Sequence, residues 1–361
     1  MSPVKYTEDV ETLVENEASL IAEIVTAMGV TQRRAFDTHR HASRDAHAKS
    51  HGFLKGTLTV LSGLEPELAQ GMFASPTKYP VIIRLSSAPG DLHSDKVPAP
   101  RGFAMKVIGV AGERLLSADA GHNQDFLLVN IPTLSFGTIP AYKKMLKLLE
   151  ENSHRPEFLQ RALTGAAHGI VEAAEALNVE PGATLRGLGQ DNSNILGETF
   201  HSMAAIRFGN YIAKVSVAPL SENVRSLTGV PMNDLDESRI RDVVVEHFRN
   251  QGAQYELRAQ LCADLAEMPV EDASVLWKSE ASPHRPIATI DIPAQDAFSP
   301  ARRVYGDDIL SFNVWHGIAE HRPLGSIMRS RIQAYERSTA FRHQMNLQPR
   351  IEPDNIDSIP D

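Results

Sequence analysis

The pattern of apolar and polar positions divides the chain into helical and extended segments. Residues 9–29 carry apolar side chains at helical spacing and end at a glycine, which predicts an N-terminal helix. From about residue 54 to 136 the pattern changes to short apolar runs separated by Pro, Gly, Asp and Ser, which is typical of β-strands. These runs are KGTLTVL, YPVIIRLSS, RGFAMKVIGV, ERLLSA and QDFLLVN.

The second half of the chain mixes both patterns. Helices are predicted over 140–180, over DESRIRDVVVEHFRNQGAQYELRAQLCADL and over LGSIMRSRIQAYERSTAFRHQ. Two further β-type runs, MAAIRFGNYIAKVSVAPL and RPIATIDIPAQ, bring the strands located to seven. With no repeat and no Gly/Ser linker, we predict one domain over residues 1–350, of the α+β class, with an antiparallel β-barrel surrounded by helices. Residues 350–361 are acidic and contain proline, which predicts a loose tail.

Composition and charge narrow the function classes. The chain has 361 residues, 42% hydrophobic and 22% charged, with a net charge of −9. Because it lacks the clustered Lys and Arg that phosphates require, we expect no nucleic-acid partner. The acidic N-terminal segment has no apolar core, and no window approaches the ~18 apolar residues of a membrane span. We therefore expect a cytoplasmic protein that binds no membrane.

Common catalytic motifs are missing from the sequence. There is no GxxxxGK[ST] or GxGxxG loop, no GxSxG and no HExxH. The single cysteine, Cys262, excludes an internal disulfide and a Cys-based metal cluster, and its helical spacing predicts a buried structural thiol. His39, Arg40 and His41 form an HRH group, which could be a metal site, an ordinary surface loop or a salt-bridged His pair.

The C-terminal helix carries an unusual group of side chains. Arg331, Tyr335 and Arg342 are spaced so that all three lie on one helix face. The phenol could simply pack under the arginine stems. Alternatively, the guanidinium charges could lower the pKa of Tyr335 and favour a tyrosinate, which is a known proximal ligand of haem iron.

A second basic group begins near the first predicted strand, in RDAHAKSHGFLKGTLTV. Arg44 precedes His47 by three residues, and Arg84 lies in the run VIIRLSS. A bound haem would need cations for its two propionates. Arg44, Arg84 and Arg342 could supply these cations, with His47 on the opposite side of the iron from Tyr335.

These segments, taken together, resemble the haem catalases, and most closely the short catalase-related peroxidases called mini-catalases. The matching pieces are RDAHAKSHGFLKGTLTV, VIIRLSS, PRGFAMKV, QDFLLVNIP and RIQAYERSTAFR, in the family's order. The resemblance covers about 36–150 and 300–345. It implies a barrel of about eight strands and a haem b buried between the barrel and the C-terminal helix.

The resemblance also implies a role for each matching residue. His47 would be the distal acid–base, oriented by Ser86, and Tyr335 would be the proximal iron ligand, held as its anion by Arg331. Arg44, Arg84 and Arg342 would pair with the propionates.

Two assignments stay open. The distal amide is either Asn130, which we favour because Pro132 follows it, or Asn123. Phe136 is the candidate aromatic residue over the porphyrin, with Tyr142 as a second one, and core packing would explain either equally well.

By this resemblance the chain would be a haem peroxidase/catalase that reduces hydrogen peroxide or organic hydroperoxides through a ferryl intermediate. Its partners would be peroxide, a small organic electron donor and further copies of itself in a homo-oligomer. One alternative is an allene oxide synthase-like enzyme, although Ala46 stands where that branch has a threonine. The others are a non-catalytic haem-binding barrel and a haem-free barrel that binds a lipid.

Overall fold

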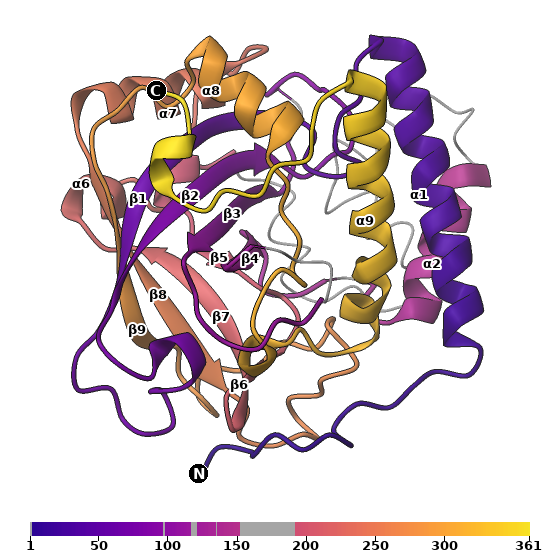
Figure 1. The fold of residues 1–361 in the computed structure, drawn as a ribbon, viewed down its shortest axis with the longest axis vertical. Coiled ribbons are helices and arrows are strands. Elements are labelled where there is room, and N and C mark those ends of the chain that lie inside the picture. Colours follow the sequence, from indigo (N-terminus) through magenta and orange to yellow (C-terminus); the bar gives the residue numbers. More distant parts are fainter. Residues whose placement is uncertain (1, 97, 117–120, 135, 152–191) are drawn as a thin grey trace.

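Eight antiparallel strands close into a β-barrel, as the sequence predicts. The computed structural model describes residues 2–96, 98–116, 121–134, 136–151 and 192–361. The order around the barrel is β5-β4-β3-β2-β1-β9-β8-β7, and pairing of β5 with β7 completes the ring (Figure 1). The strands are β1 (Ser50–Val60), β2 (Lys78–Ser87), β3 (Arg101–Ile108), β4 (Asn123–Val129), β5 (Phe200–His201), β6 (Ile206–Phe208), β7 (Tyr211–Pro219), β8 (Ala253–Leu261) and β9 (Arg285–Ile292).

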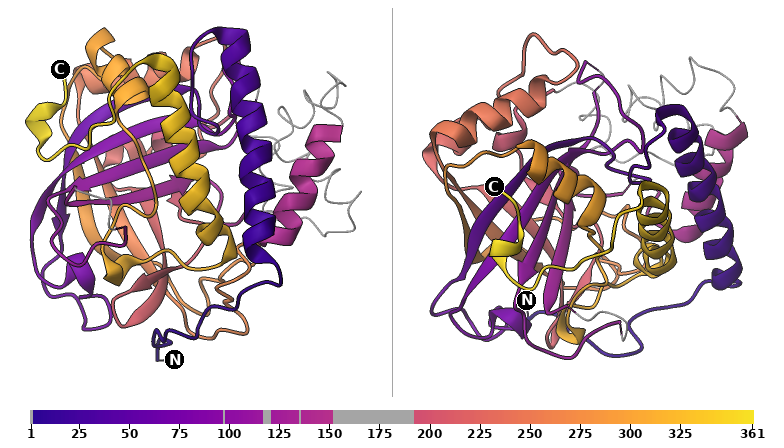
Figure 2. Two further views of the ribbon diagram at one scale, coloured as in Figure 1. Left: turned by 45° about the vertical axis from the view of Figure 1, so that its right-hand side comes forward. Right: turned by 45° about the horizontal axis from the view of Figure 1, so that its top comes forward.

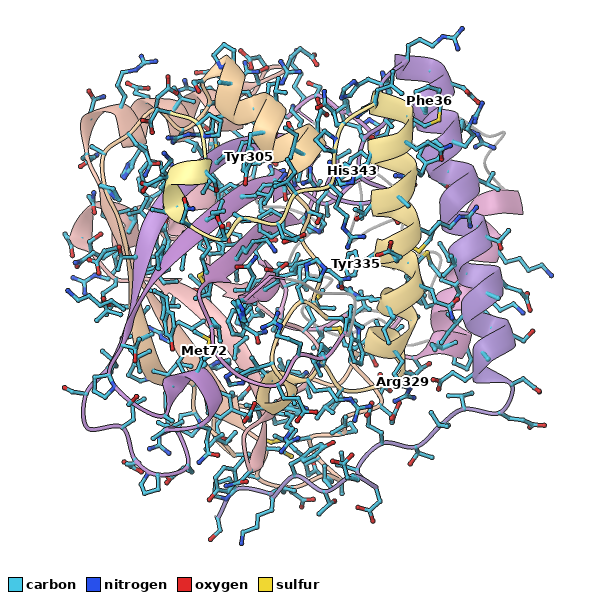
Figure 3. All side chains as sticks on the ribbon, in the orientation of Figure 1. Phe36, Met72, Tyr305, Arg329, Tyr335 and His343 are labelled. Carbon is cyan, nitrogen blue, oxygen red and sulfur yellow. The ribbon has the colours of Figure 1, made fainter. Side chains whose placement is uncertain are left out.

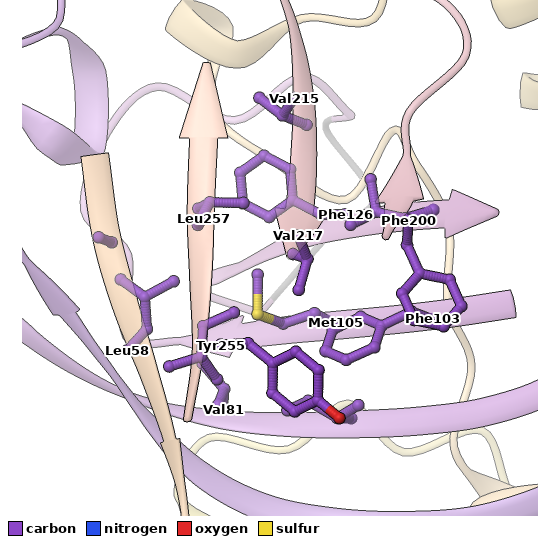
Figure 4. Close-up of a cluster of buried hydrophobic side chains, with 14 of the residues drawn as sticks. Leu58, Val81, Phe103, Met105, Phe126, Phe200, Val215, Val217, Tyr255 and Leu257 are labelled. Carbon is purple, nitrogen blue, oxygen red and sulfur yellow. The ribbon is translucent and has the colours of Figure 1, made fainter. Parts of the chain in front are cut away.

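Alternation along the strands fills the barrel with apolar side chains. On β2, Ile83 and Leu85 point inward, whereas Arg84 and Ser86 lie on the outer face, because successive side chains of a strand point to opposite sides. The interior includes Phe103, Met105, Phe126, Phe200, Tyr255 and Leu257, which Figure 4 shows in contact across the barrel. Arg84, Ser86, Lys106 and Asp125 are thereby left on the outer wall.

One strand that sequence patterning missed is β8. We predicted a helix through this segment, but the helix α7 (Arg239–Asn250) ends before it, and Ala253–Leu261 pairs with β7 and β9. The residues YELRAQL are good helix formers, yet Tyr255, Leu257 and Ala259 alternate with polar positions and are buried in the barrel, so tertiary packing overrides propensity. Cys262 follows the strand and is buried, as expected, although not on a helix.

Two other assignments also differ from the structure. The run ERLLSA, described over residues 113–116, contributes an isolated bridge between Arg114 and Ile318 rather than a strand. The short strand β5 was not predicted. The predicted helix over 140–180 is observed as α2 (Ile139–Glu151) in its first part, and the rest lies outside the described residues.

Helices cover one side of the barrel in layers. The long helix α9 (Ser326–Asn346) lies next to the barrel, α1 (Glu17–His39) packs on α9, and α2 packs on α1 (Figures 1 and 2). The short helices are α6 (Glu222–Arg225) and α8 (Pro300–Val304). Among the residues described, no helix combines the length and apolarity needed to cross a membrane.

The first helix is longer and later than the predicted 9–29. It continues through Gly29, which the sequence analysis took as its end, to a left-handed cap at Arg40. At Gly29 the guanidinium of Arg337 on α9 occupies the space that a side chain would need, and Arg337 donates to the Val25 carbonyl. Glycine at this position thus serves close packing of two helices rather than helix termination.

The C-terminal segment is not a loose tail. Glu352 binds Lys106 of β3 at 2.9 Å and accepts from Ser311 at 2.6 Å. Near the end, Ile359 is buried and Asp361 pairs with Lys55 at 2.7 Å. Two of the acidic residues that suggested disorder, Glu352 and Asp361, instead bind lysines of the barrel strands.

A buried histidine should make stability depend on pH. The ring of His321 lies between Phe73 and Phe208, and its Nε2 accepts the Met72 N–H at 3.1 Å. Burial lowers the pKa of His321 to about 3 from an ordinary value of 6.5. Between these values the unfolded chain binds more protons, so the free energy of unfolding falls as the pH falls below about 6.5, by about 1.4 kcal/mol per pH unit from this residue.

Urea denaturation at several pH values checks this expectation. The His321→Gln variant also loses the packing of the ring. The comparison is therefore between the slopes of the free energy of unfolding against pH, not between the free energies themselves. A wild-type protein and a His321→Gln variant with parallel slopes between pH 6.5 and 4 would contradict it.

Candidate functional site

A cavity lies between the outer wall of the barrel and α9. It encloses about 1190 Å³ of space free of protein atoms, part of it open to solvent. Side chains from β2, β3 and β4 form one wall and those from α9 form the other, with Met28 of α1 and Tyr142 of α2 at the edges. Figure 3 shows Tyr335 on the side of α9 that faces the barrel. The fold thus places the segment before β1 and the C-terminal helix α9 on the walls of the same cavity.

On the barrel wall, His47 and Ser86 form a hydrogen-bonded pair. His47 Nδ1 lies 3.0 Å from Ser86 Oγ, and the backbone of His47 is left-handed, with φ 56°. Burial, and then the charges of Arg84, Arg331 and Arg44, lower the pKa of His47 to about 3. The imidazole is therefore neutral at neutral pH, with Nδ1 fixed by Ser86.

Three arginines meet at one end of the cavity around the turn Tyr305–Ile309. Arg44 and Arg84 share one carboxylate oxygen of Asp307, at 3.4 and 3.2 Å, while Arg342 donates to the Asp307 carbonyl at 2.6 Å. Burial lowers the pKa of Arg342 to about 10, and burial with the neighbouring guanidiniums lowers that of Arg44. The Nε of Arg84 is buried with no hydrogen-bond partner among the described residues. This end of the cavity therefore suits further anionic groups.

On the helix wall, Arg331 donates from Nη1 to Tyr335 Oη at 2.9 Å. Burial raises the pKa of Tyr335, and Arg331 opposes this while Asp45 adds to it. Arg331 thus lowers this pKa, as expected, but in the protein alone the pKa of Tyr335 is still raised, because loss of hydration disfavours the phenolate more than one guanidinium stabilises it. A cation at the phenol oxygen would be needed to hold the anion.

Comparison with known proteins identifies the fold. No family model matches the sequence, and no curated protein is similar to it in sequence. Among solved structures, catalase A from Saccharomyces cerevisiae aligns with 15% identity and a TM-score of 0.57, over 98% of this chain and 72% of that one. A bacterial catalase aligns with 14% identity and a TM-score of 0.60, over 96% of this chain and 67% of that one. A fungal catalase aligns with 14% identity and a TM-score of 0.58, over 99% of this chain and 72% of that one.

The chain has the catalase fold. Of the residues that the sequence analysis selected, seven line the cavity of this fold: Arg44, His47, Arg84, Ser86, Arg331, Tyr335 and Arg342. They come from the segment before β1, from β2 and from α9, and meet only because the barrel wall and α9 face each other.

Neither candidate asparagine lies on the cavity of the catalase fold. Asn130 accepts the Arg101 N–H at its Oδ1, at 2.7 Å, and Asn123 donates from Nδ2 to the Pro353 carbonyl at 3.0 Å. Asn123 lies at the far end of β4, and Asn130 follows Val129, which faces the cavity.

Of the two aromatic candidates, one lines the cavity and the other does not. Phe136 is buried and is not among the residues that line the cavity. Tyr142, the second candidate, does line it. The residues that sequence reasoning missed are Asp307, which binds two arginines, and Gly102, whose signal was its place in RGFAMK at the start of a strand.

The HRH group is exposed at the end of α1, where His39 is the last helical residue and Arg40 is the cap. His39 pairs with Asp91 at 2.5 Å and His41 with Asp308 at 2.8 Å. Within the described ranges no group of three or more His, Cys, Asp or Glu residues is arranged to hold a metal ion. Each of these exposed histidines therefore contacts one carboxylate.

Gly102 should be essential to the position of His47. A Cβ at residue 102 would lie 2.5 Å from His47 Nδ1 and 2.6 Å from Ser86 Oγ, closer than any van der Waals contact. We expect Gly102→Ala to push the imidazole out of its buried place, so that its pKa rises from about 3 toward 6.5. Titration of the His47 ring followed by NMR measures this.

Ser86→Ala is the matched control, because it removes the hydrogen bond without crowding the ring. It should leave the pKa of His47 low, since burial is the largest cause. An unchanged titration in Gly102→Ala would contradict the steric argument.

Proposed function

We propose that this protein is a haem-dependent peroxidase with catalase activity, which reduces hydrogen peroxide or organic hydroperoxides. The observation that carries the proposal is the pair of opposed groups across one cavity: His47–Ser86 on the barrel wall and Tyr335–Arg331 on α9. A neutral base facing a phenol that needs a cation is the arrangement expected around an iron porphyrin.

The donor set fits haem b. Its two propionates are anions, and the three clustered arginines, with the unpartnered Nε of Arg84, supply buried cationic donors for them. The Tyr335 oxygen is a hard anionic ligand for ferric iron once it loses its proton, and Arg331 would stabilise it in that form. The apolar cavity residues, among them Leu127, Phe312 and Ile327, suit the porphyrin faces.

Each protein group would have a defined part in the reaction. A bound haem would supply the redox centre at which the peroxide O–O bond breaks. His47, neutral and held at Nδ1 by Ser86, would take a proton from the peroxide at Nε2 and return it to the departing oxygen. Arg331 would hold the Tyr335 oxygen as its anion through the hydrogen bond that it already makes.

The rest of the proposal concerns partners. A small organic molecule would be the electron donor for the peroxidase reaction, and the protein would act as a homo-oligomer in the cytoplasm.

Ala46 lines the cavity without a hydroxyl, so the hydrogen bond to His47 comes from Ser86. This gives no support to the allene oxide alternative, in which a threonine before the histidine makes that bond.

The test is the visible spectrum of purified protein supplied with haemin, before and after hydrogen peroxide, repeated on Tyr335→Phe. We expect a ferric haem band in the wild type, a displaced or lost band in the variant, and oxygen release or donor oxidation by the wild type only. Arg337→Lys, on the far face of α9 against α1, is a control that should keep the band. Absence of a haem band in the wild type would refute the proposal.

A further inference from the structure

The three arginines at one end of the cavity are oriented by main-chain carbonyls. Arg44 makes three hydrogen bonds of 2.8 to 3.2 Å to carbonyls within residues 306–310. Arg342 makes three more of 2.6 to 3.1 Å within the same turn, and Arg84 donates to the Ala48 carbonyl at 3.2 Å. A carbonyl carries no net charge, so these bonds fix the directions of the guanidiniums without neutralising them.

The side chain of Asp307 supplies negative charge to this cluster. Its Oδ1 lies 3.4 Å from Arg44 and 3.2 Å from Arg84, and its Oδ2 accepts from the Ser50 hydroxyl at 2.7 Å. The three arginines line the cavity, whereas Asp307 is not among the lining residues. The carboxylate therefore contacts the guanidiniums without taking up space in the cavity.

The charges of this cluster leave a defined excess. The three guanidiniums bring three positive charges and Asp307 brings one negative charge, so two positive charges remain. The neighbouring carboxylate of Asp308 is bound to His41, at 2.8 Å, rather than to an arginine. Haem b has two propionates, so the excess equals the charge that the cofactor would bring.

We propose that Asp307 is a built-in counter-ion of the cofactor site, which stabilises the haem-free protein and loosens the hold of the arginines on bound haem. This inference rests on the haem function proposed above. Because main-chain carbonyls already orient Arg44 and Arg342, the contribution of the Asp307 side chain is its charge.

Two electrostatic effects give the same direction. Without the Asp307 carboxylate, the haem-free protein would hold arginines that have lost their anionic partner, which destabilises a fold. Bound propionates would replace that partner, so the loaded protein would lose less. The carboxylate also repels the propionates, since all of them are anions near the same guanidiniums. Removing it should therefore weaken the haem-free fold and tighten haem binding.

The experiment compares the wild type with Asp307→Asn, Asp307→Glu and Asp308→Asn. Asp307→Asn keeps an oxygen toward the arginines and can donate to the Ser50 oxygen, so it removes mainly charge. Asp307→Glu restores the charge. Asp308→Asn is the matched control, because it removes an equal charge one residue later, where the carboxylate contacts His41.

Two readouts are needed, and neither depends on turnover. The first is the urea midpoint of each protein purified without haem. The second is the rate at which haemin-loaded protein loses haemin to an excess of apomyoglobin, followed in the visible spectrum. We expect Asp307→Asn to lower the midpoint and to slow haemin loss on the order of 10-fold. Asp307→Glu should lie close to the wild type, and Asp308→Asn should change both values less than Asp307→Asn.

Three results would overturn the inference. Faster haemin loss from Asp307→Asn would show that the carboxylate orients the arginines instead. An unchanged urea midpoint in that variant is the second, and equal shifts in Asp308→Asn are the third. An Asp307→Asn protein that folds only with haemin present would be the extreme form of the expected result, provided that Asp307→Glu still folds without it.

The haem band of the wild type, recorded first, separates the two proposals. If this band is missing, the haem function and this inference fall together. If the band is normal and Asp307→Asn loses haemin at the wild-type rate, only this inference falls.

Discussion

His47→Gln is expected to lower peroxide turnover by about 10²–10⁴-fold while the haem band remains. Glutamine retains hydrogen-bonding capacity near Ser86 but cannot take up and return a proton in the reaction. Arg84, Arg331 and Arg44, with burial, keep the His47 imidazole neutral, with a pKa of about 3. The base form is therefore present throughout the pH range in which a peroxidase would be assayed.

Steady-state rates with guaiacol at pH 5 to 8 check this prediction. His47 should add no acidic limb to the wild-type profile in this range, because its titration lies below it. Ser86→Ala is the control for positioning: it loses the 3.0 Å bond to Nδ1 but keeps the base, so the rate should fall less than in His47→Gln. If the His47→Gln variant turned over peroxide within 10-fold of the wild-type rate, the acid–base would be another group of the cavity. Asp45 is the first candidate.

Lys106→Met is expected to destabilise the fold by about 3–5 kcal/mol. Lys106 is fully buried on the outer wall of β3, with its Nζ at 2.8 Å from Asp125 and 2.9 Å from Glu352. Burial alone would lower the pKa of Lys106, but the two carboxylates outweigh it and raise that pKa, so the amine stays charged. Removing the cation leaves Asp125, whose side chain is fully buried, and the partly exposed Glu352 without their lysine partner.

The double variant Lys106→Met/Asp125→Asn separates charge from packing. The asparagine oxygen still accepts the Asn313 N–H, which Asp125 binds at 2.9 Å, and no buried unpaired charge remains at that position. We expect the double variant to recover most of the lost free energy of unfolding, measured by urea denaturation at pH 7. A double variant no more stable than Lys106→Met would show that the cost comes from lost packing, including the contact of Lys106 with Phe312 at 5.6 Å.

Periodic patterns located β2, β3 and β4. The runs that became β2, β3 and β4 were visible because one side of each faces the barrel core and the other carries Arg84, Lys106 or Asp125. The segment of β8 was misread because its residues favour a helix when isolated, and only its two neighbouring strands fix it as extended. The end of α1 was also misplaced. Gly29 was taken as a helix end, but the glycine is required there because the Arg337 side chain of α9 packs against it.

By itself the sequence determined the fold class and the cavity residues of α9, because helical spacing alone puts Arg331, Tyr335 and Arg342 on one face. It also supplied His47, Arg44 and Arg84 as candidates. Only the tertiary structure decided the partners of these groups: Asp307 shared by two arginines, Gly102 under the imidazole, and burial that raises the pKa of Tyr335. It also decided that Val129, not Asn130, faces the cavity. Side-chain direction at a strand end depends on the register with neighbouring strands, and pKa depends on burial, and neither quantity is local in sequence.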